Sequence, residues 1–141
     1  MKRFFVLICC LGLFLGCKKD AIHDITKYKW EFTSFTVSPA LTRNGKTSKN
    51  MNDFYDKEQC QTAVVFFSNY TYSISSPDPK CNGYYNGDPS TWKKRGELIL
   101  LNDHNAKHTL VLKGNQMTET TAGEENGVLY TFVRTYTAVP K

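Results

Sequence analysis

The stretch VLYTFVRTYT, residues 128–137, alternates along its whole length between two kinds of side chain. Three aromatic residues and Arg134 share one face of the extended chain, whereas small or β-branched residues dominate the other. This period of two is typical of a β-strand. No comparable stretch after residue 27 has helical periodicity, so we expect an all-β fold. Alternating or apolar runs predict eight strands, at residues 28–37, 62–67, 70–75, 90–93, 97–101, 107–113, 116–121 and 128–137.

Short turns join most of these predicted strands. Gly114-Asn115 is a two-residue hairpin signal, and Ser68-Asn69 predicts another tight reversal. Neighbouring strands are therefore expected to pair in order and antiparallel, and eight such strands can close into an up-and-down barrel. A flat meander or a sandwich is the alternative, but a sandwich needs long crossovers. The two long segments, residues 38–61 and 76–89, are polar and rich in turn formers, and we expect them to be loops over the barrel rim.

The first residues have the layout of a secretory signal peptide. Lys2 and Arg3 precede an apolar run at residues 4–15, which is too short to span a bilayer as a helix. The sequence FLGC that follows resembles the lipobox of bacterial lipoproteins, in which the cysteine is acylated, for example with palmitate, and becomes the first mature residue. The expected division is a signal peptide at residues 1–16, a lipidated N-terminus and tether at 17–26 with Cys17 as the lipidation site, and a barrel domain at 27–141.

Two cysteines remain for the folded domain. Cys9 and Cys10 lie in the removable run, and Cys17 is the predicted lipid site. Cys60 and Cys81 form an even pair in an exported chain, which favours a disulfide between them. Such a bond would close a loop of about 20 residues and stabilise the fold by about 3 kcal/mol.

Composition argues against several function classes. Loss of Lys2 and Arg3 with the signal peptide lowers the formal net charge from +5 to +3, and the remaining charges are dispersed in both signs, so nucleic acid is not an expected partner. No nucleophile, phosphate-loop or zinc-hydrolase motif is present, and we expect neither an enzyme nor a cofactor nor a metal. An uncharacterised hydrolase is the less favoured alternative. His104 and His108 are expected to be solvated loop residues, and Glu124-Glu125 a solvated hairpin tip.

The order of short motifs resembles the small lipocalin-like lipoproteins of Bacteroidetes. The residues that carry this likeness are Cys17, Trp30, Cys60, residues 66–72, Cys81, Trp92 and Arg134. In lipocalins, the tryptophan of the first strand packs at the closed end of the barrel beneath an arginine of the last strand. The resemblance therefore implies a structural pair of Trp30 and Arg134 at the barrel floor.

A lipocalin-like barrel would be expected to bind a small hydrophobic or amphipathic ligand at its open end. Candidate rim residues are Phe54 and Tyr55 in the first long loop and Tyr84 and Tyr85 in the second; Phe32 and Tyr72 are candidate interior residues. The alternative for each loop pair, which we favour, is that these aromatics pack on the barrel as ordinary anchors.

Two functions stay open from the sequence: a lipid-anchored ligand-binding protein, and a solid barrel that serves as an interaction module of an envelope or nutrient-uptake complex. Lys18 directly after Cys17 does not resemble the acidic signal that retains lipoproteins in the inner membrane. We therefore expect the outer membrane, and the face of that membrane stays open.

Overall fold

The structure is a computed structural model that describes residues 24–55, 63–81, 90–103 and 106–141. The described residues form three short 3-10 helices, η1 (Ile25–Lys27), η2 (Met51–Phe54) and η3 (Pro79–Cys81). They also form the strands β1 (Tyr28–Arg43), β2 (Lys46–Asn50), β3 (Val64–Phe67), β4 (Thr71–Ser75), β5 (Ser90–Arg95), β6 (Leu98–Asn102), β7 (Lys107–Lys113), β8 (Gln116–Glu125) and β9 (Val128–Pro140).

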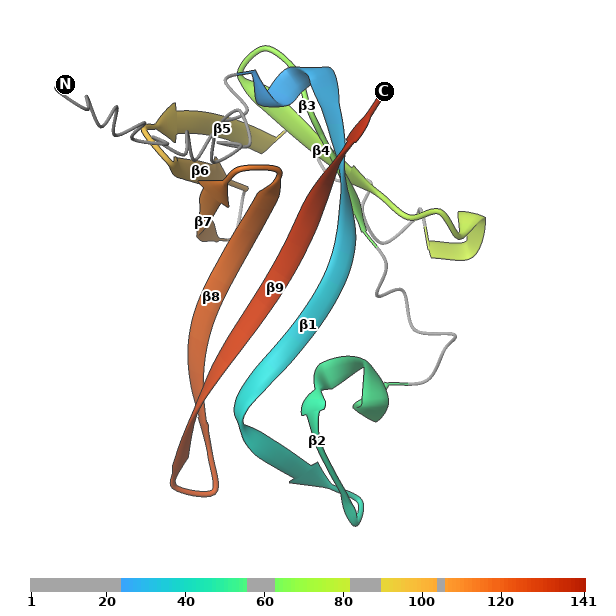
Figure 1. Ribbon diagram of the computed structural model, residues 1–141, viewed down its shortest axis with the longest axis vertical. Helices are drawn as coiled ribbons and strands as arrows, with labels where there is room; N and C mark the ends of the chain where they lie inside the picture. Colours follow the sequence, from blue (N-terminus) through green and yellow to red (C-terminus); the bar gives the residue numbers. More distant parts are fainter. Residues whose placement is uncertain (1–23, 56–62, 82–89, 104–105) are drawn as a thin grey trace, which may run out of the picture.

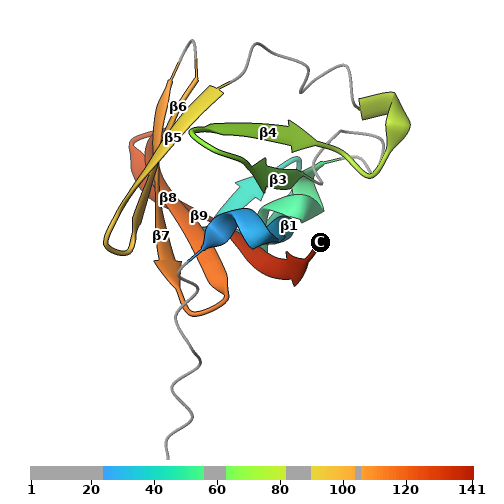
Figure 2. The ribbon, with the colours of Figure 1, turned by 90° about the horizontal axis from the view of Figure 1, so that it is seen from above.

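Eight of these strands close into an antiparallel barrel. The order β1-β3-β4-β5-β6-β7-β8-β9 follows the chain, and β9 returns to pair with β1 from Tyr28↔Pro140 to Ser38↔Thr131. Figures 1 and 2 show these strands wound around a common interior. The predicted all-β, eight-stranded up-and-down barrel is confirmed.

Three strands are longer than the barrel requires. β1, β8 and β9 continue together beyond β3–β7 as a ribbon, and β2 pairs with the far half of β1 (Figure 1). The expectation that residues 38–61 form one long loop is therefore wrong for their first part. Asn44 and Gly45 both have positive φ, at 51° and 75°, which is the backbone that a tight turn between twisted strands needs. Leu41 lies near the end of β1, just before this turn, and its buried side chain holds the polar hairpin against the rest of the fold.

The turn between β3 and β4 also differs from the expectation. The strand predicted at residues 70–75 begins with Tyr70. It instead has a positive φ of 65° and is 80% exposed, while the backbone N–H of Ser68 donates to the carbonyl of Thr71 across the turn. The reversal therefore includes Tyr70, and the side chain points into solvent.

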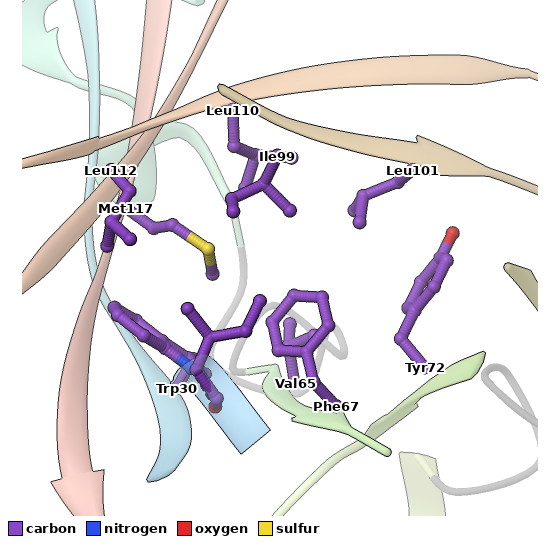
Figure 3. Packing of buried hydrophobic residues seen from close by; sticks show 10 residues of the cluster. Trp30, Val65, Phe67, Tyr72, Ile99, Leu101, Leu110, Leu112 and Met117 are labelled. Atoms are coloured by element: carbon purple, nitrogen blue, oxygen red, sulfur yellow. Dashed lines mark hydrogen bonds between the residues drawn. The ribbon is translucent and has the colours of Figure 1, made fainter. Parts of the chain in front are cut away.

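The core has two parts. The larger one fills the barrel near η1 and consists of buried side chains from six strands and from η1 (Figure 3), namely Ile25, Trp30, Val65, Phe67, Tyr72, Ile99, Leu101, Leu110, Leu112 and Met117. The smaller one lies where η2 covers the ribbon and consists of Val37, Leu41, Met51 and Tyr130, with Phe35, Phe54, Tyr55 and Phe132 packed against them. Each of the two core parts joins strands that are far apart in the sequence.

A β-bulge in β1 explains how one strand serves both core parts. The pairing of β1 with β9 shifts between Phe32 and Ser34. Before the shift Trp30 points into the barrel; after it Phe35 and Val37 point to the same side, opposite Arg134 and Phe132. Without the extra residue, Phe35 and Val37 would lie on the outer face.

Candidate functional site

Charged side chains point into the barrel beyond its apolar core. His108 lies two residues before the buried Leu110 on β7, and Glu119 lies two residues after the buried Met117 on β8. Arg134 is opposite Glu119 in the register of β8 and β9. The alternation that turns the apolar neighbours inward therefore turns these three residues inward as well.

Glu119 is the centre of this group. Its side chain is 8% exposed, and its Oε1 lies 2.6 Å from Nδ1 of His108. Nη1 of Arg134 donates to the other oxygen at 3.4 Å. Nε2 of His108 lies 3.6 Å from a carboxylate oxygen of Asp103, at the end of β6. We call Asp103, His108, Glu119 and Arg134 the charged cluster.

Arg134 stacks on an aromatic ring, but not on the expected one. Its guanidinium carbon lies 4.6 Å from the centre of the Phe35 ring, a cation–π contact. Trp30 lies opposite Ala138 on β9, four residues or about 13 Å further along the strand. The expected pair of Trp30 and Arg134 is therefore replaced by Phe35 and Arg134.

Trp30 itself belongs to the larger core part. The side chain is 0% exposed, and its Nε1–H donates to the carbonyl of Ile25 at 3.2 Å. Tyr28 contacts the indole edge-on, with ring centres 6.4 Å apart. Among the described side chains, every buried nitrogen or oxygen has a hydrogen-bond partner.

Tyr72 connects the apolar core to the charged cluster. Its ring packs near that of Phe67, with centres 6.2 Å apart. Burial raises the pKa of the Tyr72 hydroxyl above its ordinary value, and the carboxylates of Asp103 and Glu119 raise it further, whereas a hydrogen bond with Ser90 acts in the opposite direction. The hydroxyl is thus a neutral polar group at the boundary of the two regions.

The other candidate ligand residues have different surroundings. Phe32 is half-buried and meets Tyr136 edge-on, with ring centres 6.1 Å apart. Phe54 and Tyr55 pack on the smaller core part, as ordinary loop anchors do. Tyr84 and Tyr85 lie outside the described residues, as do Cys17, Cys60 and the predicted signal peptide. Cys81 is buried at the end of η3, and its pairing with Cys60 stays a prediction.

The expectation for His108 was wrong. The sequence Asp103-His104-Asn105 indicated a turn, and His108 was expected to be solvated with it. His108 belongs to β7, in agreement with the strand predicted at residues 107–113, and its side chain faces inward and is 35% exposed, while His104 lies outside the described residues. Within the described ranges, no group of three or more His, Cys, Asp or Glu side chains is placed to hold a metal ion.

The charged cluster keeps hydrogen-bond donors accessible beside aromatic side chains. Arg134 carries donors that Glu119 does not use, and the side chains of His108 and Arg134 remain 35% and 46% exposed. Phe35 and Tyr72 provide apolar surface next to them. The arrangement therefore combines partly exposed hydrogen-bond donors with aromatic surface.

No protein-family model, curated protein or solved structure matches the chain. In the part of the chain that the structure describes, none of the helices is long and apolar enough for a membrane span.

Proposed function

We propose that this protein is a lipid-anchored protein of the bacterial cell envelope, of lipocalin-like type, whose barrel binds a small amphipathic molecule beside the charged cluster. The observation that carries the ligand proposal is the carboxylate of Glu119, which faces the interior of a closed barrel and is almost fully buried. Burying a charge costs free energy even when it is paired, and such groups gather at functional sites.

The orientation of the ligand follows from the cluster. A polar group, such as a carboxylate or sulfonate, would accept hydrogen bonds from Arg134, and the apolar part would lie against Phe35 and Tyr72. The role of Arg134 is to hold the polar group; the role of Glu119 is to hold His108 and Arg134 in place, through its two oxygens.

Binding is tested with the full chain in mild detergent and with 8-anilinonaphthalene-1-sulfonate, an amphipathic anion whose fluorescence rises in apolar surroundings. We expect saturable binding, and a loss of affinity of about tenfold or more in Arg134→Gln, because one charge-assisted hydrogen bond contributes about 1.5–3 kcal/mol. Arg95→Gln is the matched control, since Arg95 is exposed at the end of β5. Equal affinity in the wild type and Arg134→Gln would contradict the proposal.

The lipid anchor rests on Lys2, Arg3, the apolar run and the lipobox-like residues before Cys17. Several acyl chains on one cysteine bind a membrane stably, whereas a single chain binds only marginally. We propose the outer membrane as the location, because Lys18 follows the cysteine.

Cys17→Ser is expected to give an uncleaved precursor without acyl chains, because the thiol is the acylated group. Mass spectrometry of the membrane-extracted protein measures both changes, and Thr91→Ser, at an exposed position on β5, is a control that leaves the N-terminus intact. A Cys17→Ser protein that is still acylated and processed would overturn the assignment.

A second function is favoured by a different observation. Val128 and Leu129, at the far end of the ribbon, are 41% and 67% exposed. Neighbouring exposed apolar side chains at a protruding hairpin are a feature of interaction modules. The alternative function is therefore that of an accessory subunit of an envelope or nutrient-uptake complex.

A further inference from the structure

The ribbon has a strand edge that no described strand covers. On one side, β8 pairs with β9 along its whole length, from Gln116↔Thr137 to Glu125↔Val128. On the other side, its pairing with β7 runs only from Lys113↔Gln116 to Leu110↔Glu119. Residues 120–125 of β8 thus have one free edge among the described strands, in the part of the ribbon that extends beyond β7 (Figure 1).

This free edge lacks several of the features that usually prevent strands from pairing between molecules, and its only charged residues, Glu124 and Glu125, lie at one end. Its sequence, TTAGEE, contains no lysine and no proline, and its register with β9 shows no bulge. Thr120, Thr121 and Ala122 are exposed. Gly123 allows the ring of Phe132 to lie close: a β-carbon there would meet Phe132 Cε2 at 3.3 Å. The edge is therefore regular and open to solvent.

The other ribbon edge, in β2, shows the contrast. β2 carries Lys46 and Lys49 within five residues. Nζ of Lys46 also donates to the carbonyl of Asp53, so that η2 and the residues around it lie against this strand. Charged side chains and a covering segment are the usual protection of a sheet edge. The edge of β2 has both kinds of protection, whereas the edge of β8 has charged residues only at its end and no covering segment among the described residues.

We propose that the free edge of β8 pairs antiparallel with the same edge of a second copy of this chain, centred on Ala122. In this register Thr120 lies opposite Glu124 of the second copy, Thr121 opposite Gly123, and Ala122 opposite itself. Within residues 120–124 no like charges face one another, and the threonine hydroxyl can donate to the glutamate carboxylate.

The register also leaves existing contacts in place. Residues at equal distances from Ala122 point to the same face of the sheet, as a two-fold axis perpendicular to the sheet requires. Glu125 stays outside the pairing, and its ion pair with Arg43 at 2.7 Å is kept. The interface involves few residues, so the dimer is expected to be weak and to form only at high protein concentration. Anchoring in a membrane would raise the local concentration of the protein and so favour the dimer.

The test is cysteine cross-linking of the full chain in the membranes of the expressing bacterium. Ala122→Cys places two thiols opposite each other on the two-fold axis, where opposed α-carbons are about 4.5–5.5 Å apart, within the range that a disulfide needs. We expect the protein to shift from monomer to dimer mass on a non-reducing gel, and to return to monomer mass after reduction.

Further cysteine variants test the proposed register and measure cross-linking that arises from random collisions between molecules. Thr120→Cys and Glu124→Cys are each expected to stay monomeric alone and to cross-link when the two variants are co-expressed, because these positions face each other. Lys49→Cys, on the protected edge of β2, is expected to stay monomeric. Absence of the Ala122→Cys dimer, equal cross-linking by Lys49→Cys, or a cross-link to a different protein would each overturn the proposal. The result does not depend on whether the barrel binds a ligand.

Discussion

Replacement of Trp30 by alanine is expected to lower the free energy of unfolding by about 3–5 kcal/mol. The indole is 0% exposed, and it lies among side chains from the opposite wall of the barrel as well as from its own strand (Figure 3). Because protein interiors are closely packed, the surrounding side chains can fill only part of the space that the substitution leaves. Domains of this size are stable by about 5–15 kcal/mol in total, so the loss is a large share.

Urea unfolding, followed by far-ultraviolet circular dichroism, measures this change. We expect the urea concentration at the midpoint to fall, while the dependence of the free energy of unfolding on urea concentration stays unchanged. Trp30→Phe keeps an aromatic ring but loses the hydrogen bond to the Ile25 carbonyl, and we expect a smaller loss of about 1–3 kcal/mol. Leu129→Ala is the control for removal of an exposed apolar side chain, with an expected change of about 0.5 kcal/mol or less. A Trp30→Ala midpoint equal to that of Leu129→Ala would show that the barrel floor does not depend on Trp30.

The barrel itself could be predicted from sequence because its strands are amphipathic and its turns are short. The eight predicted ranges coincide with the eight barrel strands to within a few residues at most ends, with longer continuations in β1, β8 and β9. β2 was missed because residues 46–50, KTSKN, are polar on both faces, so that no alternation marks them as a strand. The Asn44-Gly45 dipeptide was the available signal, since it is the preferred pair for a tight hairpin turn.

The charged cluster was harder to predict than the fold. Glu119 and His108 each lie two residues from a buried apolar residue, Met117 and Leu110, and therefore on the same face of their strands. This spacing could have placed them inside the barrel. Both faces of these strands carry polar and apolar residues, however, so the sequence alone does not show which face is buried. The partner of Arg134 depends on register. The bulge after Phe32 moves Phe35 opposite Arg134, and a single extra residue in a strand cannot be placed from composition.

Removal of the Glu119 carboxylate is expected to destabilise the fold by about 1–3 kcal/mol, the second largest effect that we predict. Glu119→Ala leaves His108 and Arg134 without the acceptor that lies between them, and it opens a small space beside Met117. The loss is smaller than for a fully buried ion pair, because His108 and Arg134 keep partial access to water, which replaces some of the lost hydrogen bonds.

A double-mutant cycle separates the contact from the loss of packing. His108→Ala alone should also destabilise the fold, and His108→Ala combined with Glu119→Ala should cost less than the two single losses together, with a coupling of about 0.5–3 kcal/mol. Glu97→Ala is the control, because Glu97 is an exposed glutamate in the turn between β5 and β6. If the free-energy losses of the two single variants simply add, the 2.6 Å contact contributes nothing to stability. That result would contradict the proposal that the charged cluster is a preformed site.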